Sequence, residues 1–236
     1  MLPRAIFFDL DDTLLRYNIS LESAWKKACD ISLEDSKTIK TPYLIHQIDI
    51  VREWYWSDTE RHQAGRLNLH SARTDIVRMA LERLGYTDEQ TASNIAANYA
   101  EIMDETLGFF PNYENTLDEL VRKDVKLALL TNGAGAVQLA KIKRFGIARY
   151  FPVCLIEGEL GYGKPDKRVF EMALSKLYIS PNQAWMVGDD LERDIAGAHS
   201  AGIFSIWHDY RKKGLPADSK IKPDKIINDI TELLTM

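Results

Sequence analysis

The sequence predicts an α/β protein, built as a doubly wound parallel sheet with an inserted α-helical domain. Short apolar runs recur at the start of the chain and across its second half, and helical patterns separate them. A long segment between these regions shows helical patterns only. The 236 residues are 45% hydrophobic and 28% charged, which is ordinary globular composition. At roughly 150 residues per domain, this length predicts one or two domains.

Each apolar run predicts one strand of the sheet. Most of the runs do not alternate polar with apolar residues, which is typical of parallel strands covered on both faces. The expected strands are 5–8, 125–130, 153–156, 184–187 and 203–207, with a weaker sixth at 226–227.

The helical patterns between these runs predict crossover connections. One apolar helix face begins after Pro165 and Asp166 and consists of Val169, Phe170, Ala173, Leu174 and Leu177. Strands that alternate with such helices form right-handed βαβ units, and these build a Rossmann-like core.

The segment 16–110 is expected to form a separate helical domain of about four helices, while 1–15 and 111–236 form the core. Its repeating apolar positions, for example Ile76, Ala80 and Leu84, fit one face of a helix. An independent N-terminal helical domain is the alternative. It is disfavoured because residues 4–9 have the composition of a core strand and precede the helices.

Charge and cysteine content exclude several classes of protein. The net charge of −5 argues against a dedicated binder of nucleic acid or anionic membranes, which usually carries a basic patch. The two cysteines form no CxxC pair, so neither a disulfide framework nor a zinc-finger spacing is present. Neither a signal-peptide pattern nor an apolar stretch of about 20 residues occurs, so we expect a cytoplasmic protein.

The first candidate motif is an acidic turn, Asp9-Leu10-Asp11-Asp12, directly after the first strand. Three acids beside a buried strand are costly unless a cation or hydrogen-bond donors compensate them. Carboxylate oxygens suit Mg²⁺. An Asp-rich turn that caps a helix explains the same residues without a metal.

Two further motifs could hold an anion. Thr131-Asn132-Gly133 follows the second strand, where a hydroxyl and free backbone N–H groups can cradle a phosphate, although a plain helix cap is the commoner use. Residues 158–165 nearly match a P-loop, but Pro165 replaces the required Ser or Thr, which excludes that motif. Lys164, fixed between a glycine and a proline, could instead bind an anion.

The fourth motif is a second acidic group. Asp189 and Asp190 follow the strand 184–187, and Asp194 lies within one helical turn of them. The helix dipole favours acids at a helix N-terminus, but this explains one acid more easily than three. All four motifs follow predicted strands and therefore meet at one edge of the sheet. Carboxylates, a lysine, phosphate donors and a metal together are what phosphoryl transfer to a carboxylate needs.

In order and combination, the four motifs resemble those of the haloacid dehalogenase (HAD)-like hydrolases. The resemblance covers nearly the whole chain and implies a Rossmann-like core with a helical cap inserted after the first strand. It is specific for the superfamily and not for a substrate.

The resemblance implies a role for each motif residue. Asp9 would be the nucleophile, and Asp11 the general acid and then the general base. Mg²⁺ would be held by the carboxylates of Asp9 and Asp189 and by the backbone carbonyl of Asp11. The phosphoryl group would be bound by Thr131, Asn132 and Lys164. Two acids, Asp190 and Asp194, would orient the metal waters or the lysine.

An acid at position 11 favours a phosphatase over a dehalogenase, because a dehalogenase has no alkoxide to protonate. A phosphomutase and a non-catalytic relative that binds a phosphorylated ligand remain alternatives. The expected partner is a small phosphorylated metabolite, such as a sugar phosphate or a nucleoside monophosphate, and the expected assembly is a monomer or a homodimer.

Substrate choice is expected to come from the helical domain, because the core motifs contact only phosphate. The segment 52–62 is the most unusual stretch there, and its candidate specificity residues are Trp54, Trp56 and Arg61. Adjacent aromatic residues on a helix point about 100° apart, so they cannot all share one core face. Core or interface packing of the aromatic residues and a solvated arginine are the alternative interpretation.

Overall fold

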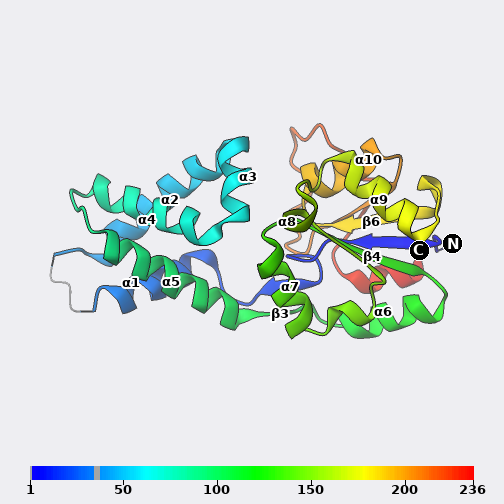
Figure 1. Cartoon of the computed structure of the whole chain (residues 1–236), viewed down its shortest axis with the longest axis horizontal. Coiled ribbons are helices and arrows are strands. Elements are labelled where there is room, and N and C mark those ends of the chain that lie inside the picture. Colours follow the sequence, from blue (N-terminus) through cyan, green and yellow to red (C-terminus); the bar gives the residue numbers. More distant parts are fainter. Residues whose placement is uncertain (1, 35–37) are drawn as a thin grey trace. The chain divides into compact units, whose positions relative to one another are not determined.

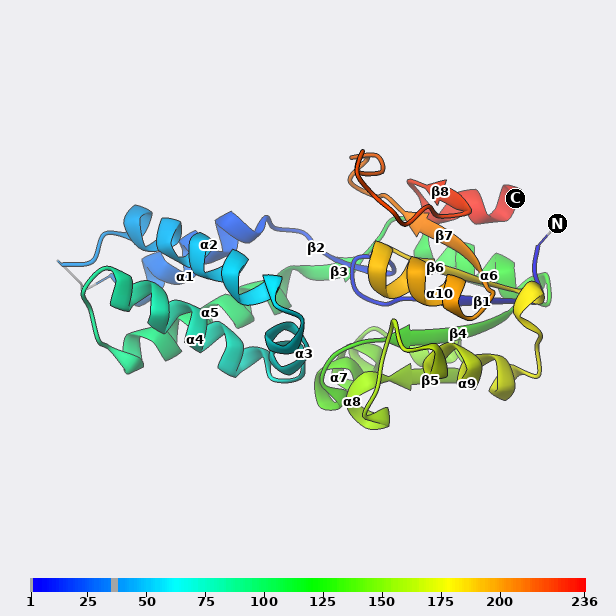
Figure 2. The same ribbon diagram turned by 90° about the horizontal axis from the view of Figure 1, so that it is seen from above.

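The protein consists of two compact units in a computed structural model that describes residues 2–34 and 38–236. Unit 1 comprises residues 1–16 and 109–236, and unit 2 comprises residues 17–108. The chain passes between them through two short paired strands, β2 (Leu15–Tyr17) and β3 (Leu107–Phe109). Figures 1 and 2 show the two strands side by side. The helical unit is therefore an insertion whose two ends lie together.

Unit 1 is built on a six-stranded sheet in which every pairing is parallel. In chain order the strands are β1 (Ala5–Phe8), β4 (Lys126–Thr131), β5 (Val153–Ile156), β6 (Ala184–Gly188), β7 (Phe204–His208) and β8 (Lys225–Ile227). Their spatial order is β5-β4-β1-β6-β7-β8. The predicted fold class and all six expected strands are confirmed, with strand ends that differ by one residue.

The strand β1 is at the centre of this sheet. Ile6 pairs in register with Leu127 of β4 on one side and with Trp185 of β6 on the other. All four residues of β1 are fully buried. This explains why the sequence shows a continuous apolar run there, because helices cover both faces of the sheet.

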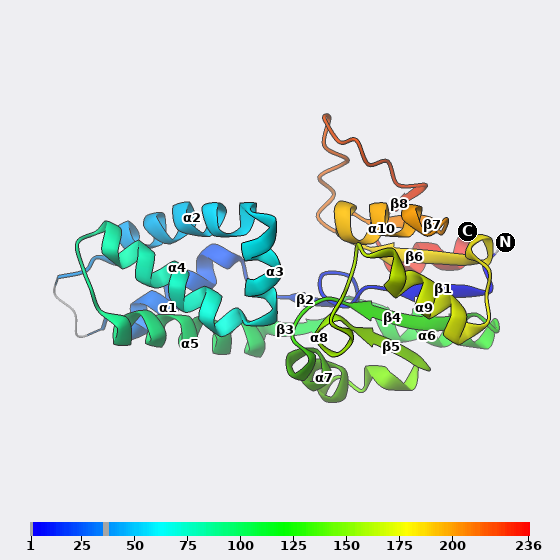
Figure 3. The same cartoon turned by 45° about the horizontal axis from the view of Figure 1, so that its top comes forward.

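Helices pack on both faces of the sheet, as Figures 1 and 3 show. The helical elements of unit 1 are α6 (Tyr113–Arg122), α7 (Gly135–Arg144), η1 (Ile147–Arg149), α8 (Glu157–Leu160), α9 (Lys167–Leu177), η2 (Pro181–Gln183), η3 (Leu191–Ala196), α10 (Gly197–Ser200) and η4 (Ile230–Thr235). The segment η3 is π-helical, a form often found at functional sites.

The helix α9 packs against the sheet through the apolar face that the sequence predicts. Asp166 caps it, because its carboxylate accepts the backbone N–H of Arg168. Its apolar face, including Phe170 and Ala173, packs in one cluster with Ala5 and Phe7 of β1. The helix thus covers the face of the sheet predicted for it.

Unit 2 contains five helices among its described residues, where the sequence analysis expected about four. They are α1 (Leu21–Ser32), α2 (Thr41–Ser57), α3 (Thr59–Leu67), α4 (Leu69–Arg83) and α5 (Glu89–Thr106). The extra helix is the short α3. It arises because Asp58 and Asn68 leave the helical conformation and cap the next helix, through the N–H groups of Arg61 and Ser71. None of the described helices has the length and apolar character needed to cross a bilayer.

Truncation of Phe170 is expected to destabilise unit 1 strongly. The side chain is fully buried against the sheet, so Phe170→Ala should lower the free energy of unfolding by about 3–5 kcal/mol. Phe204→Ala is the matched control, because that side chain is 38% exposed and should cost clearly less. Denaturant unfolding measures both values. An equal loss for the two variants would contradict this view of the core.

Candidate functional site

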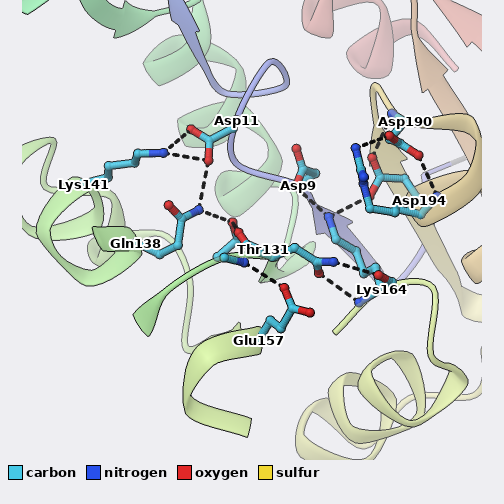
Figure 4. Close-up of polar contacts among 12 residues, drawn as sticks. Asp9, Asp11, Thr131, Gln138, Lys141, Glu157, Lys164, Asp190 and Asp194 are labelled. Carbon is cyan, nitrogen blue, oxygen red and sulfur yellow. Dashed lines mark hydrogen bonds and ion pairs between the residues drawn. The ribbon is translucent and has the colours of Figure 1, made fainter. Parts of the chain in front are cut away.

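The order of the strands creates the site. The chain continues from β1 to β4 and β5 on one side of β1 and then crosses to β6, β7 and β8 on its other side, so β1 lies at a topological switch point. Parallel strands bring their carboxyl ends to one edge, which places Asp9 and Asp189 directly beyond β1 and β6, and Thr131 at the last position of the neighbouring β4. Figure 4 shows Asp9 and Thr131 among the side chains that gather there.

A buried lysine lies at the centre of this cluster. The side chain of Lys164 is 2% exposed, and its Nζ lies 2.6 Å from Asp9 Oδ1 and 2.6 Å from Asp194 Oδ1. Burial alone would lower the pKa of Lys164, but the charges of Asp194 and Asp9 hold that pKa above its usual value. The lysine is therefore a permanent cation that is buried among carboxylates.

Three carboxylates surround one another at this point. Asp9, Asp189 and Asp194 each offer an oxygen, and these oxygens lie within 4.8 Å of one another. Burial, with added repulsion from Asp194, raises the pKa of Asp9 to about 7 although Lys164 opposes the rise. Burial and the charge of Asp9 likewise raise the pKa of Asp189 well above its ordinary value.

These residues fit a divalent cation. One ammonium group faces three carboxylates, which leaves the cluster with an excess of buried negative charge. The donors are all oxygens, the ligand type that Mg²⁺ prefers.

Asn132 holds the lysine loop in place. Its Oδ1 accepts the backbone N–H of Lys164 at 2.9 Å, and its Nδ2 donates to the Lys164 carbonyl at 2.7 Å. A Cβ on Gly163 would lie 2.6 Å from Asn132 Oδ1, so only glycine permits this approach. The loop that carries Asn132 and the loop that carries Lys164 are thus hydrogen-bonded to each other, although they belong to different sequence motifs.

The loop after β4 has a further partner that the sequence did not reveal. Glu157 is buried, and its Oε2 accepts the backbone N–H of Gly133 at 3.0 Å. The sequence predicted free backbone N–H groups in this loop. That expectation is wrong for Gly133, because a carboxylate from α8 already occupies its N–H.

Asp11 is held by the helix α7. Its two carboxylate oxygens lie 2.7 and 2.8 Å from Lys141 Nζ, and Gln138 Nε2 donates to its Oδ2 at 2.9 Å. The same Gln138 nitrogen lies 2.5 Å from Thr131 Oγ1. The amide donates to the Thr131 oxygen, and the Thr131 hydroxyl itself has a long contact of 3.5 Å to the Asn132 carbonyl oxygen as its acceptor.

Neither of these two α7 residues was predicted from the sequence. Gln138 is only 2% exposed, although glutamine is usually an exposed residue. The one available signal was the spacing of three between Gln138 and Lys141, which puts two polar residues on one face of the helix that follows Thr131.

Asp190 and Asp194, two acids of the fourth motif, make different contacts. Asp190 caps η3 by accepting the N–H groups of Glu192 and Arg193, and it pairs with the Arg193 side chain. Asp194 is buried and accepts the Asp190 N–H at 3.0 Å while it faces Lys164. A Cβ on Gly188 would lie 2.1 Å from Asp194 Oδ2, so the glycine makes room for this carboxylate.

The three candidate specificity residues lie in unit 2. Trp54 is 48% exposed, and the Arg61 guanidinium stacks 3.9 Å from its ring centroid while it donates to the carbonyls of Tyr55 and Trp54. Trp56 is partly buried against the core of the helical unit. These contacts describe local packing, and a role in specificity stays a prediction.

Mg²⁺ is expected to stabilise the protein through the carboxylate cluster. At 100 times its Kd, a ligand of the native state adds about 2.7 kcal/mol, or a rise in Tm of about 5–10 °C for a unit of this size. Asp189→Asn should shrink this rise, and it should increase Tm without metal because it relieves repulsion with Asp9 and Asp194. Differential scanning calorimetry with Mg²⁺ or chelator measures both effects.

Asp218→Asn is the control, because this exposed acid lies in the loop before β8 and outside the three-carboxylate cluster. It should keep the Mg²⁺-dependent rise in Tm. An undiminished rise in Asp189→Asn would refute the cluster as the metal site.

A family model for known proteins matches most of this chain. Residues 3–202 match the haloacid dehalogenase-like hydrolase family. A phosphoserine phosphatase from Thermus thermophilus is 38% identical over 162 residues, which are 68% of this chain and 63% of that protein, slightly less than two thirds of its length. A ribulose-1,5-bisphosphate 5-phosphatase from Halopiger xanaduensis is 30% identical over 87% of this chain and 84% of that protein.

Solved structures show the same fold. The HAD-hydrolase YfnB from Bacillus subtilis superposes with a TM-score of 0.73 at 20% identity, covering 100% of this chain and 98% of that chain. The likeness therefore extends over both units.

Proposed function

The chain belongs to the haloacid dehalogenase-like hydrolases, and from this premise we propose that it is a Mg²⁺-dependent phosphatase that hydrolyses a small phosphorylated metabolite through an aspartyl-phosphate. One observation carries the proposal. Asp9, beyond the central strand, is paired with the buried Lys164 inside a carboxylate cluster that fits a divalent cation. The phosphatases among its relatives support this reaction class.

In the first step, an oxygen of Asp9 attacks phosphorus and the bond from phosphorus to the leaving oxygen breaks. Lys164 balances the charge of Asp9 and of the transferred group, and its tight pairing keeps the attacking carboxylate in place. The Thr131 hydroxyl, whose oxygen already accepts from Gln138, donates its proton to a phosphoryl oxygen. Asp9 and Asp189 would hold Mg²⁺, which would supply charge neutralisation and orientation.

Asp11 moves the proton in both steps. In its acid form it protonates the leaving alkoxide, which would otherwise depart as a strong base. The resulting carboxylate then removes a proton from the water that attacks the aspartyl-phosphate, and phosphate and free Asp9 are released. Lys141 and Gln138 fix the position of this carboxyl group.

Asp9→Asn is expected to abolish turnover, because the amide is not a nucleophile toward phosphorus and forms no acyl phosphate. Phosphate release with Mg²⁺ measures this, and circular dichroism checks that the variant is folded. Asp218→Asn, an exposed acid in the loop before β8, is the control and should retain wild-type activity. Appreciable turnover by Asp9→Asn would exclude Asp9 as the nucleophile.

Asp11→Asn is expected to slow the enzyme most for poor leaving groups. General acid catalysis contributes about 10²–10⁴-fold, and an alkyl phosphate needs it more than a nitrophenyl phosphate. The ratio of kcat/KM between the two substrates, in wild type and variant, measures the effect. If both substrates lose activity equally, Asp11 does not protonate the leaving group.

Phosphate release from a panel of compounds would identify the class of substrate. The panel contains sugar phosphates, nucleoside monophosphates, phosphoserine and ribulose 1,5-bisphosphate. We propose that chelator-sensitive phosphate release is strongest for one of these classes. Isomerisation of a sugar phosphate without phosphate release would instead identify a phosphomutase. Binding without any turnover would identify a non-catalytic relative.

A further inference from the structure

A tryptophan side chain of β7 reaches the loop that follows the neighbouring strand β6. Trp207 pairs in register with Gly188, the last residue of β6. Its side chain is buried, and the indole Nε1 donates to the backbone carbonyl of Asp189 at 2.7 Å. One of the three clustered carboxylate residues is therefore hydrogen-bonded, through its backbone, to an uncharged side chain outside the cluster.

The peptide group between Asp189 and Asp190 is held at both of its polar atoms. Trp207 donates to its carbonyl oxygen, and its N–H donates to Asp194 Oδ2 at 3.0 Å (Figure 4). A peptide group is planar, so two such contacts fix its orientation and with it the backbone dihedral ψ of Asp189. The rotamers open to a side chain depend on these dihedrals. The two hydrogen bonds therefore limit the directions in which the Asp189 carboxylate can point.

The end of β7 is a firm support for the indole. Two residues after Trp207, the backbone N–H of Asp209 donates to the carbonyl of Ile227 at 2.9 Å. The carbonyl of Asp209 accepts Asn228 Nδ2 at 2.8 Å. The backbone that carries Trp207 thus stays bonded to β8 and to the loop after it, so the indole has a fixed base.

The same segment also contacts the acidic loop that follows β1. The Tyr210 hydroxyl hydrogen-bonds the carboxylate of Asp12, and it accepts the Arg211 Nε–H at 2.7 Å. Asp12 lies three residues after Asp9. The end of β7 is therefore bonded to both loops that supply the carboxylate cluster.

We propose that Trp207 is a positioning residue of the metal site. Its indole N–H holds the Asp189 peptide so that the carboxylate lies beside Asp9 before a cation arrives. The proposal rests on the Mg²⁺ site of the proposed function. Residues that orient metal ligands typically contribute about 10–100-fold to metal affinity, so loss of the indole N–H should weaken Mg²⁺ binding by about that factor.

The competing explanation is that the indole only fills space and satisfies its own N–H. Trp207→Phe removes the N–H but also reduces the volume of the side chain. A second variant carries 3-benzothienylalanine at position 207, in which sulfur replaces the N–H and the shape is kept. Positioning predicts weaker Mg²⁺ binding in both variants. Space filling predicts a lower Tm in chelator for Trp207→Phe alone and the same Mg²⁺ affinity in both.

The experiment titrates each protein with MgCl₂ in a calorimeter, and Tm in chelator checks that each variant is folded. Trp185→Phe is the matched control, because Trp185 lies near the start of β6, where its ring packs with Phe204. It should keep the wild-type Mg²⁺ affinity. In the Asp189→Asn background, Trp207→Phe should cause little further loss, because it acts through Asp189.

Mg²⁺ affinity that is unchanged in both position-207 variants, or a full further loss in the Asp189→Asn background, would overturn the positioning role and leave the metal site standing. A wild type that binds no Mg²⁺ would overturn both. If Mg²⁺ affinity falls as expected but the wild type releases no phosphate from any substrate, the phosphatase proposal fails and the role of Trp207 stands.

Discussion

The ion pairs of Lys164 with Asp9 and Asp194 are the interaction around which the core site is arranged. A lysine with 2% of its side chain exposed is unfavourable unless carboxylates compensate it, and it lies 2.6 Å from both. Two neighbouring residues support these ion pairs. Asn132 forms two hydrogen bonds with the Lys164 backbone, and Gly188 leaves space for the Asp194 carboxylate. Removing the lysine would leave several like charges buried together, so the site and the stability of the core are coupled.

The fold and the positions of the motifs could largely be predicted from the sequence. Continuous apolar runs such as 153–156 have few alternatives in a chain of this composition, and acids that follow two of these runs had to meet at one edge. These apolar runs can be recognised in the sequence because both faces of a parallel sheet are buried, so consecutive strand residues are apolar.

What could not be predicted depends on side chains that meet from distant parts of the chain. Gln138 bridges Asp11 and Thr131, and Glu157 occupies the Gly133 N–H, yet neither residue forms a motif with its partners. The same holds for Trp25 and Tyr99, which belong to different helices. The break between α2 and α3 was also missed, because capping by Asp58 depends on one residue leaving the helical conformation.

The position of β1 in the sheet has a consequence for synthesis of the protein. Ala5 pairs with Lys126 and with Ala184, so its second partner is translated about 180 residues later. At about 5–20 residues per second, an entirely apolar strand waits on the order of ten seconds or more for both neighbours. During that interval residues 17–108, which form a compact unit of their own, have all been translated. The nascent chain therefore carries an entirely apolar strand that still lacks one of its two sheet neighbours long after the segment of the helical unit has been synthesised.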